Sequence, residues 1–549
     1  MPAYAPRITL ETHEVTNQPP EFFGRNLYRI DTALCEAVRR TGADWLDTRL
    51  DSLGELMGSE AMLEAGATAN RNPPELISFD RYGRRLDEVR FHPAYHQLMS
   101  AAMEHRIHDI AWAEDRPGRH VAHAALLSVF TQAEAGVMCP INMTYAAVPA
   151  LRHQPDVTRG WLDTLIGGTY DAPLRPIGEK SGITLGMAMT EKQGGSDVRA
   201  NTTRAEPIDA SARLYRLTGH KWFCSAPMSD GFLTLGYTAE GLSCFLVPRI
   251  TPDGRRNAIH LMRLKDKLGN KSNASAEIEY HGATGWLIGE AGRGVPTIID
   301  MVHHTRLGTI SGTLGIMRMA LVQALNHATG RRVFQKTLID QPAMRGVLAD
   351  LALEYEAAVA LVIRVATAFE AHEGPERAFA RLSVALAKYW LTKRNPGFVF
   401  ECMECMGGAG YVEESPLPRL YREAPLNAIW EGSGNVIALD VLRTLAKEPQ
   451  AREAFLAECN AQRGQHGHFD AALDALIADM ENPVGEAQAR ALTGRMALQL
   501  QAALLLAHAP AAIAKAFSES RLGPTNGRLF GVLPDGANLQ AILDRQAFE

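Results

Sequence analysis

The chain has 549 residues, a hydrophobic fraction of 46% and a formal net charge of −6. At roughly 100–200 residues per domain, this length predicts about three or four domains with ample core. The charge provides no chain-wide basic field that would attract nucleic acid or anionic lipid. Seven cysteines in so long a chain do not form a disulfide framework, and the N-terminus lacks the pattern of a signal peptide. We therefore expect a cytoplasmic protein that does not span a membrane.

The pattern of apolar residues changes once in the first half of the chain. Residues 1–180 lean helical, because apolar residues recur at three- and four-residue spacing over 31–40 and 101–130. Residues 181–287 instead contain short runs of apolar and aromatic residues separated by turn residues. This second pattern predicts an antiparallel sheet or a small barrel.

Helical periodicity returns in the second half of the chain. Residues 288–447 contain long amphipathic segments, so we expect a helical bundle there. An Ala- and Leu-rich tail, 448–549, predicts a further helical domain up to about residue 520. Its most apolar part, 496–517, is interrupted by polar residues and predicts a buried helix pair rather than a membrane span. The expected fold class is mainly α with a central β-barrel.

A short polar loop follows the apolar run 183–189. It contains the adjacent glycines Gly194 and Gly195, which allow the backbone to turn tightly and to approach a ligand closely. Thr190 and Ser196 add hydroxyl groups beside free loop N–H groups. The loop therefore suits a polar planar or phosphate-bearing ligand, and an ordinary hairpin turn is the alternative interpretation.

Glu431 lies between Trp430 and Gly432 in an otherwise apolar segment. Such surroundings can raise the pKa of a carboxylate and make it a general base, whereas a helix-capping acid explains the same position equally well. The single Cys402-x-x-Cys405 pair has no second pair at metal-site spacing, so we predict structural cysteines and no metal site. Neither a P-loop nor the Rossmann glycine spacing occurs.

Three separated segments resemble signatures of the flavin-dependent acyl-CoA dehydrogenases. Residues 188–200 resemble the first signature, residues 404–423 resemble the second, and Glu431-Gly432-Ser433 resembles the segment that carries the catalytic glutamate in most members. Further segments narrow the resemblance to the alkylation-response branch of this family: Thr16-Asn17-Gln18-Pro19-Pro20, Asn72-Pro73-Pro74-Glu75-Leu76, Arg90-Phe91-His92-Pro93, 190–195 and 429–435.

The resemblance implies a helical domain over 1–180, a β-barrel over 181–287, a four-helix bundle over 288–447 and an extra C-terminal helical domain over 448–549. FAD is expected between barrel and bundle. The residues expected to contact it from the same subunit are Met187, Met189, Thr190, Gly195, Ser196, Trp222, Phe223, Cys224, Ser225, Trp430, Ser433 and Asn435. Those expected to reach the FAD of a neighbouring subunit are Arg331, Phe334, Gln341, Met406, Gly407 and Gly408. Shared sites imply a homo-oligomer, and a dimer of dimers is usual in the family.

The resemblance also implies the chemistry. Glu431 is expected to remove the α-proton of an acyl-CoA, and Ser196 and Arg306 are expected to contact the substrate. A minority of the family places the base immediately before this arginine, where the chain has Thr305, which cannot act as a base. Lys192 and Trp430 replace the usual Pro and Tyr, which would narrow or recharge the acyl channel. The expected activity is therefore weak dehydrogenation of a short or branched acyl-CoA, with an electron-transferring flavoprotein as one possible acceptor.

The alkylation-response branch further implies binding of double-stranded DNA through the C-terminal domain and protection of DNA from alkylation damage. Residues 441–549 contain 10 Lys and Arg against 12 Asp and Glu, so the charge count does not demand a phosphate-binding surface. A metabolic acyl-CoA dehydrogenase without DNA binding is the alternative function. The cations that could share a DNA-facing surface are Arg490, Arg495, Arg521 and Arg528.

Overall fold

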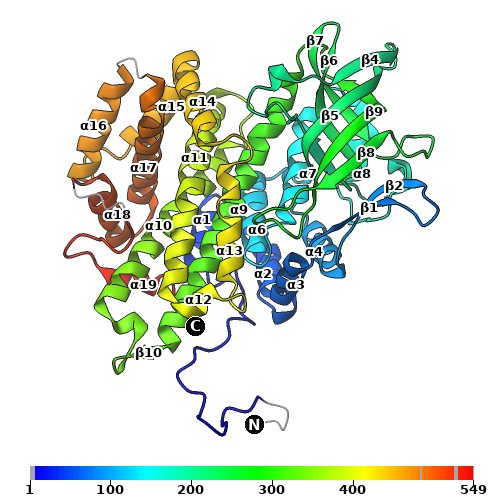
Figure 1. Ribbon diagram of the computed structural model, residues 1–549. Coiled ribbons are helices and arrows are strands. Elements are labelled where there is room, and N and C mark those ends of the chain that lie inside the picture. The colour runs from blue at the N-terminus through cyan, green and yellow to red at the C-terminus, as the bar shows by residue number, and fades with distance from the viewer. Residues whose placement is uncertain (1–5, 482–484, 525–528, 548–549) are drawn as a thin grey trace.

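The structure, a computed structural model, describes residues 6–481, 485–524 and 529–547 (Figure 1). A β-barrel lies at one end of the molecule, long helices form the centre, and the C-terminal helices cover the side opposite the barrel. The N-terminal helices pack beneath the junction of barrel and central helices. This arrangement confirms the predicted fold class, while the four domain limits stay predictions.

The N-terminal part is helical where apolar residues recur at helical spacing. α6 and α7 are buried along almost their entire length, because they pack against the long helix of the central bundle. The helices of this part are α1 (Thr32–Arg40), α2 (Asp47–Met57), α3 (Glu60–Arg71), α4 (Pro93–Glu104), α5 (Ile110–Ala113), α6 (Arg119–Thr131), α7 (Met138–Leu151) and α8 (Pro155–Leu165).

A β-hairpin, β1 (Glu75–Phe79) and β2 (Arg85–Arg90), interrupts these helices, and the helical expectation for 1–180 did not include it. Asp80 Oδ1 accepts hydrogen bonds from the turn N–H groups of Tyr82 and Arg84, at 2.8 and 2.9 Å. The hairpin lies beside the barrel (Figure 1), and Asp87 Oδ1 accepts a hydrogen bond from Leu261 N at 2.8 Å. The strand is therefore stabilised by a tertiary contact that periodicity does not reveal.

The barrel is closed and has mixed strand directions. β6, β4, β5, β9 and β7 pair in this order, and β7 pairs again with β6, while β3 and β8 extend the sheet from β6 and β9. The pairs β3–β6 and β4–β6 are parallel, so the sheet is not wholly antiparallel as predicted. The strands are β3 (Leu185–Ala188), β4 (Arg204–Asp209), β5 (Leu214–Ser225), β6 (Gly231–Thr238), β7 (Gly241–Pro248), β8 (Ile259–Leu264) and β9 (Ser275–Ile288).

The central bundle surrounds α9, which is buried along most of its 37 residues. α6, α7, α10 and α11 cover it on different sides, as its nearly continuous apolar surface requires. The elements of this part are α9 (Gly294–Gly330), β10 (Arg332–Val333), β11 (Lys336–Thr337), α10 (Pro342–Ala368), α11 (Gly374–Cys405), α12 (Gly408–Tyr411), α13 (Leu417–Glu423) and α14 (Gly434–Lys447).

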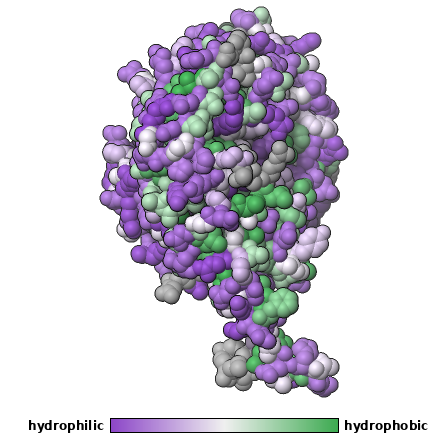
Figure 2. Space-filling model, turned by 90° about the vertical axis from the view of Figure 1, so that its left-hand side faces the viewer, coloured by the Kyte–Doolittle hydropathy of each residue, from purple (hydrophilic) through white to green (hydrophobic). Residues whose placement is uncertain are grey.

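The C-terminal helices pack on α10 and α11 and present a mostly hydrophilic outer face (Figure 2). The apolar part of the tail forms two helices in contact, α17 and α18, and across the described ranges no helix is both long and apolar enough for a membrane span. The short α19 lies beyond residue 520, where the helical prediction for the tail ended. The helices are α15 (Pro449–Asn460), α16 (Gly467–Glu481), α17 (Ala489–His508), α18 (Ala511–Phe517) and α19 (Leu539–Asp544), with a π-helical turn at Ser518–Leu522.

Candidate active site between the barrel and the bundle

A cavity of about 450 Å³ lies where the barrel, α7, α9 and the turn before α14 meet. Segments that are far apart in the sequence form its walls. The predicted site residues that line it are Met187, Met189, Thr190, Gly195, Ser196, Phe223, Ser225, Arg306, Trp430, Glu431 and Ser433.

The loop after β3 is fixed to the barrel by the buried side chain of Glu191. Its Oε1 accepts hydrogen bonds from Lys221 Nζ at 2.9 Å and from Thr203 Oγ1 at 2.6 Å. Burial acts to raise the pKa of Glu191, but Lys221 and Thr203 outweigh it and lower the pKa to about 2. Gly195 lies against Thr190, since a Cβ at position 195 would come within 2.5 Å of Thr190 Oγ1. These contacts hold the Thr190 hydroxyl at the cavity wall.

The end of β5 forms a second wall. Phe223 lines the cavity and is 46% exposed, whereas Trp222 lies beside the cavity under the ammonium of Lys265, 3.2 Å from the ring centroid. The backbone N–H of Trp222 donates to the carbonyl of Thr190 at 2.7 Å, which joins the strand to the loop. The Cys224 side chain is buried in the barrel core, so only its backbone remains for contact with a cofactor.

Glu431 faces the cavity from a tight turn, with φ of +58° at Glu431 and +99° at Gly432. A positive φ costs a non-glycine residue about 1–2 kcal/mol, and such strain is concentrated at functional sites. Glu431 Oε2 accepts a hydrogen bond from Thr305 Oγ1 at 2.7 Å. Burial raises the pKa of Glu431, and the Thr305 hydroxyl partly offsets this effect. A desolvated carboxylate of this kind is suited to proton abstraction.

Arg306 is buried beside this turn and is held at both ends of its guanidinium group. Its Nε donates to the Glu431 carbonyl at 3.3 Å, and its Nη1 donates to Asp440 Oδ2 at 2.9 Å. Arg381 donates to the other oxygen of Asp440 at 2.8 Å. Arg306 therefore anchors the turn that carries Glu431 as well as lining the cavity.

Some predicted cofactor residues lie away from this cavity. Arg331 and Phe334 flank β10, which lies at the end of α9 far from the barrel (Figure 1). Arg331 Nη1 donates to Asn17 O at 2.8 Å, and Phe334 is 92% exposed. Gln341 Nε2 donates to the carbonyl of Val333 at 3.0 Å. The predicted residues that do not line the cavity are Trp222, Cys224, Arg331, Phe334, Gln341, Met406, Gly407, Gly408 and Asn435.

Several lining residues were missed by the sequence analysis. Asn142 is a polar residue within the apolar helix α7, which is the signal that could have revealed it, and its buried Oδ1 has no hydrogen-bond partner among the described residues. Lys267 Nζ donates to Asn273 O at 2.6 Å and to Ser275 Oγ at 3.1 Å. Burial lowers the pKa of Lys267 to about 8. Met138 and Met143 add an apolar wall from α7.

These walls fit a planar heterocycle with polar edges, as in the flavin of FAD. Asn142 lines the cavity, and its buried Oδ1 is an acceptor that has no donor among the described residues. Apolar contacts for ring faces come from Met187, Met189, Phe223 and Trp430, and polar contacts for ring edges from Thr190, Ser196, Ser225 and Ser433.

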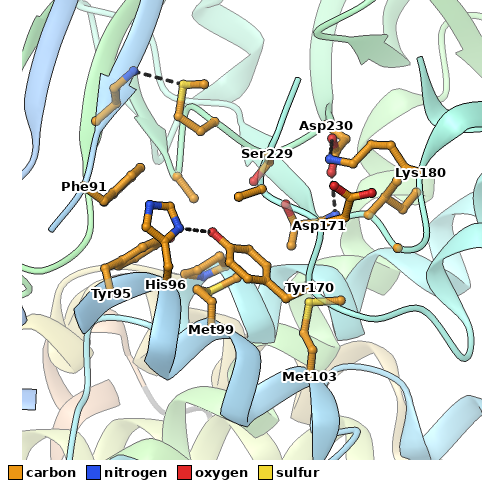
Figure 3. A pocket seen from close by; sticks show the side chains of 18 residues that line it. Phe91, Tyr95, His96, Met99, Met103, Tyr170, Asp171, Lys180, Ser229 and Asp230 are labelled. Carbon is orange, nitrogen blue, oxygen red and sulfur yellow. Dashed lines mark hydrogen bonds and ion pairs between the residues drawn. The ribbon is translucent and has the colours of Figure 1, made fainter. Parts of the chain in front are cut away.

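A second hollow of about 70 Å³ has His96, Tyr170, Lys180 and Asp230 among its lining residues (Figure 3). Its polar side chains are largely paired with one another: Lys180 bonds Asp230, and His96 Nδ1 lies 2.8 Å from the Tyr170 hydroxyl. Pro140 lines this hollow, whereas the neighbouring Cys139 lines the larger cavity. Predicted site residues, Glu431 among them, line the larger cavity and none lines this hollow, so the larger cavity is the candidate active site.

Of the four arginines that could share a DNA-facing surface, the structure describes three, and one of these three is buried. Arg521 is 7% exposed and binds Asp350 and Glu354, so its inclusion was wrong. Arg490 donates to the Tyr389 hydroxyl at 3.2 Å, and Arg495 forms an ion pair with Asp479. Arg528 lies outside the described residues. Burial between two carboxylates removes Arg521 from such a surface, whereas Arg490 and Arg495 stay exposed, and the charge count cannot reveal this difference.

Comparison with known proteins identifies the class first. The acyl-CoA dehydrogenase middle domain matches residues 186–283, and the acyl-CoA dehydrogenase C-terminal domain matches residues 292–446. The chain belongs to the acyl-CoA dehydrogenase family and is an oxidoreductase of this type. The family is FAD-dependent.

Within this family the chain belongs to the AidB branch, because residues 17–172 match the N-terminal domain of the adaptive response protein AidB. It is 48% identical to AidB of Escherichia coli (strain K12) over 94% of this chain and 96% of that protein. The structure of Caenorhabditis elegans ACDH-11 in complex with C11-CoA is similar, with a TM-score of 0.82, 26% identity and coverage of 99% of this chain and 97% of that one. The structure of Bd2924 in its apo form has a TM-score of 0.80 at 29% identity, covering 89% and 98% of the two chains.

Proposed function

We propose that this protein binds FAD in the larger cavity and dehydrogenates an acyl-CoA between its α and β carbons, with Glu431 as the base. The observation that carries the proposal is the position of Glu431: a carboxylate with a raised pKa faces the same cavity as the loop after β3 and the end of β5. FAD, when bound, supplies the acceptor for the β-hydride.

The chain's own residues have separate parts in this proposal. Glu431 takes the α-proton, and the Thr305 hydroxyl stabilises the charged form of Glu431 before substrate binds. Hydroxyl and backbone N–H groups around Thr190 and Ser196 orient the cofactor and the polar part of the ligand. The surrounding methionines, Phe223 and Trp430 exclude water from the reacting carbons.

Short or branched acyl-CoA thioesters are the proposed substrates. Trp430 occupies the cavity wall, and its indole Nε1 is held by Asn427 Oδ1 at 3.0 Å, so the side chain cannot easily swing away from an acyl chain. The C11-CoA complex of ACDH-11 supports acyl-CoA as the ligand class. An electron-transferring flavoprotein is the proposed acceptor of the electrons.

A panel of acyl-CoA thioesters tests this function. We expect yellow protein with about one FAD per chain, and bleaching of the flavin absorbance by at least one short or branched member of the panel under anaerobic conditions. Protein that is colourless and takes up no added FAD would contradict the cofactor assignment. A flavin that no thioester bleaches would contradict the dehydrogenase activity alone.

We also propose a homo-oligomer in which Arg331, Phe334, Gln341, Met406, Gly407 and Gly408 reach the FAD of a second copy. Phe334 is 92% exposed in the single chain, which supports its burial against another subunit. Light scattering of the purified protein should give a dimer or tetramer, and Phe334→Ala should weaken both assembly and FAD retention. A stable monomer with full FAD content would overturn this proposal.

Protection of DNA from alkylation, with binding to double-stranded DNA, is the second candidate function, and the match to AidB favours it. The pairing of Arg490, Arg495 and Arg521 inside the chain favours the alternative of an acyl-CoA dehydrogenase without DNA binding. Gel shifts across a salt series separate the two. No shift even at low salt would remove the DNA-binding proposal, since phosphate contacts are strongest there.

A further inference from the structure

The turn that carries Glu431 is held from two sides by buried cations. Lys388 Nζ, on α11, donates to the Trp430 carbonyl at 2.7 Å and to the Gly432 carbonyl. Arg306 Nε, on α9, donates to the carbonyl between them, that of Glu431, at 3.3 Å. Three consecutive carbonyl groups thus accept hydrogen bonds from buried cations, and Glu431 lines the cavity.

Lys388 is an unusual residue for this position. It is 1% exposed, and within the described part of the chain its hydrogen bonds go to these carbonyls rather than to a carboxylate. Burial lowers the pKa of Lys388 to about 7, and the nearby charge of Arg306 acts in the same direction. An apolar side chain would avoid the cost of desolvating an ammonium group, so packing alone does not account for a lysine here.

The turn needs these hydrogen bonds because its backbone is strained. Glu431 has a φ of +58°, a left-handed conformation that non-glycine residues rarely adopt. Without donors for the two flanking carbonyls, the turn could rotate these groups toward other partners and relax. The carboxylate would then move relative to the bound thioester.

We propose that Lys388 is a positioning residue for proton abstraction: it fixes the carbonyls on both sides of Glu431 and thereby keeps the carboxylate directed at the substrate carbon. This inference rests on the proposed dehydrogenase function for its kinetic consequence. Its structural consequence, an ordered turn at residues 430–432, does not depend on any activity.

Three variants test the proposal. Lys388→Met keeps the apolar stem but removes all N–H donors. Lys388→Arg keeps a charged donor and should restore part of the effect. Lys393→Met is the matched control, because Lys393 is exposed on the same helix and its side chain lies beside Gly434, so the change removes a lysine near the turn but leaves the carbonyl contacts of Lys388. Circular dichroism and FAD content establish that each variant is folded.

The activity-independent readout is hydrogen–deuterium exchange followed by mass spectrometry. We expect Lys388→Met to raise exchange about tenfold in peptides that cover 428–436, with the barrel unchanged and Lys393→Met like wild type. The kinetic readout is flavin reduction by the best acyl-CoA of the panel. We expect the reduction rate to fall about 10- to 100-fold in Lys388→Met, while the Kd for the thioester changes less than about twofold.

The proposal would be overturned if Lys388→Met showed the same hydrogen exchange at 428–436 and the same flavin-reduction rate as wild type. Equal effects of Lys393→Met would also overturn it, because they would indicate a general charge effect. Should Lys388→Met not fold, Lys388→Gln decides by the same exchange measurement, since its shorter amide reaches at most one carbonyl. If no thioester bleaches the wild-type flavin, the proposed function is wrong. The exchange measurement then still tests whether Lys388 orders the turn at residues 430–432.

Discussion

The hydrogen bond from Thr305 to Glu431 joins two residues that are 126 positions apart and partly offsets the effect of burial on the pKa of the candidate base. Replacing Glu431 with Gln keeps the size of the side chain but removes its ability to take a proton. We expect Glu431→Gln to retain FAD. Reduction of its flavin by an acyl-CoA should be at least about 10³-fold slower than in wild type. Stopped-flow absorbance measures this, with the exposed Glu414→Gln as control. Undiminished bleaching in Glu431→Gln would place the base elsewhere.

Thr305→Val tests the hydroxyl itself. Removing a donor to the charged carboxylate should raise the pKa of Glu431 further, because burial would then act with less opposition. The base form would appear only at higher pH, so the ascending limb of the pH–rate profile for flavin reduction should shift to more alkaline pH. Ser311→Ala, which removes a hydroxyl bonded to a backbone carbonyl of the same helix, should leave the profile unchanged. An unshifted profile in Thr305→Val would contradict the assignment.

At the scale of elements, a buried junction joins the start of α7, the barrel and α13. Glu423 Oε1 accepts a hydrogen bond from Asn270 N at 2.6 Å, and Glu134 Oε1 accepts one from Ser272 Oγ at 2.7 Å. Burial raises the pKa of Glu423 to about 7, and the nearby charge of Glu134 acts in the same direction. The junction borders the cavity through Asn270.

This junction makes stability depend on pH. The folded state holds the Glu423 proton up to about pH 7, whereas the unfolded chain loses it near the ordinary value of 4.5. The folded state therefore binds more protons between these values, and the free energy of unfolding should fall by up to roughly 3 kcal/mol as the pH rises through this window. Urea titrations from pH 5 to 8 should show this fall in the free energy of unfolding for wild type and for the exposed control Glu453→Gln. The fall should be smaller for Glu423→Gln. Parallel curves for Glu423→Gln and wild type would refute it.

At the scale of the whole molecule, Arg521 couples the C-terminal helices to the central bundle. Its guanidinium is buried between Asp350 and Glu354 of α10, and Arg394 also binds Glu354 at 2.9 Å. Arg521→Met would leave Asp350 without this partner, which typically costs about 3–5 kcal/mol. We expect a lower thermal midpoint and faster proteolysis beyond residue 508. Arg495→Met, which breaks an exposed pair with Asp479, should change stability by about 1 kcal/mol or less. Equal losses in the two variants would contradict the coupling.

The sequence by itself determined the elements and the family. Spacing of apolar residues predicted the helices of the bundle and the strands of the barrel, because side-chain periodicity follows directly from local backbone geometry. The loop from Thr190 to Asp197 and the segment around Glu431 identified the family before any contact was known. Turn-forming residues did not predict the β1–β2 hairpin, because a hydrogen bond to the barrel, which is a tertiary contact, stabilises it.

Only the tertiary structure decided which side chains meet. It directed Cys224 into the barrel core and buried Arg521 between two carboxylates, although the sequence allowed both to face a ligand. It also brought Thr305, Arg306 and Lys388 from two helices onto the turn of Glu431. Periodicity assigns a side chain to a face of its element, but the partner across that face can lie anywhere in the chain. The fold and the family could therefore be predicted locally, whereas the state of the candidate base depends on long-range packing.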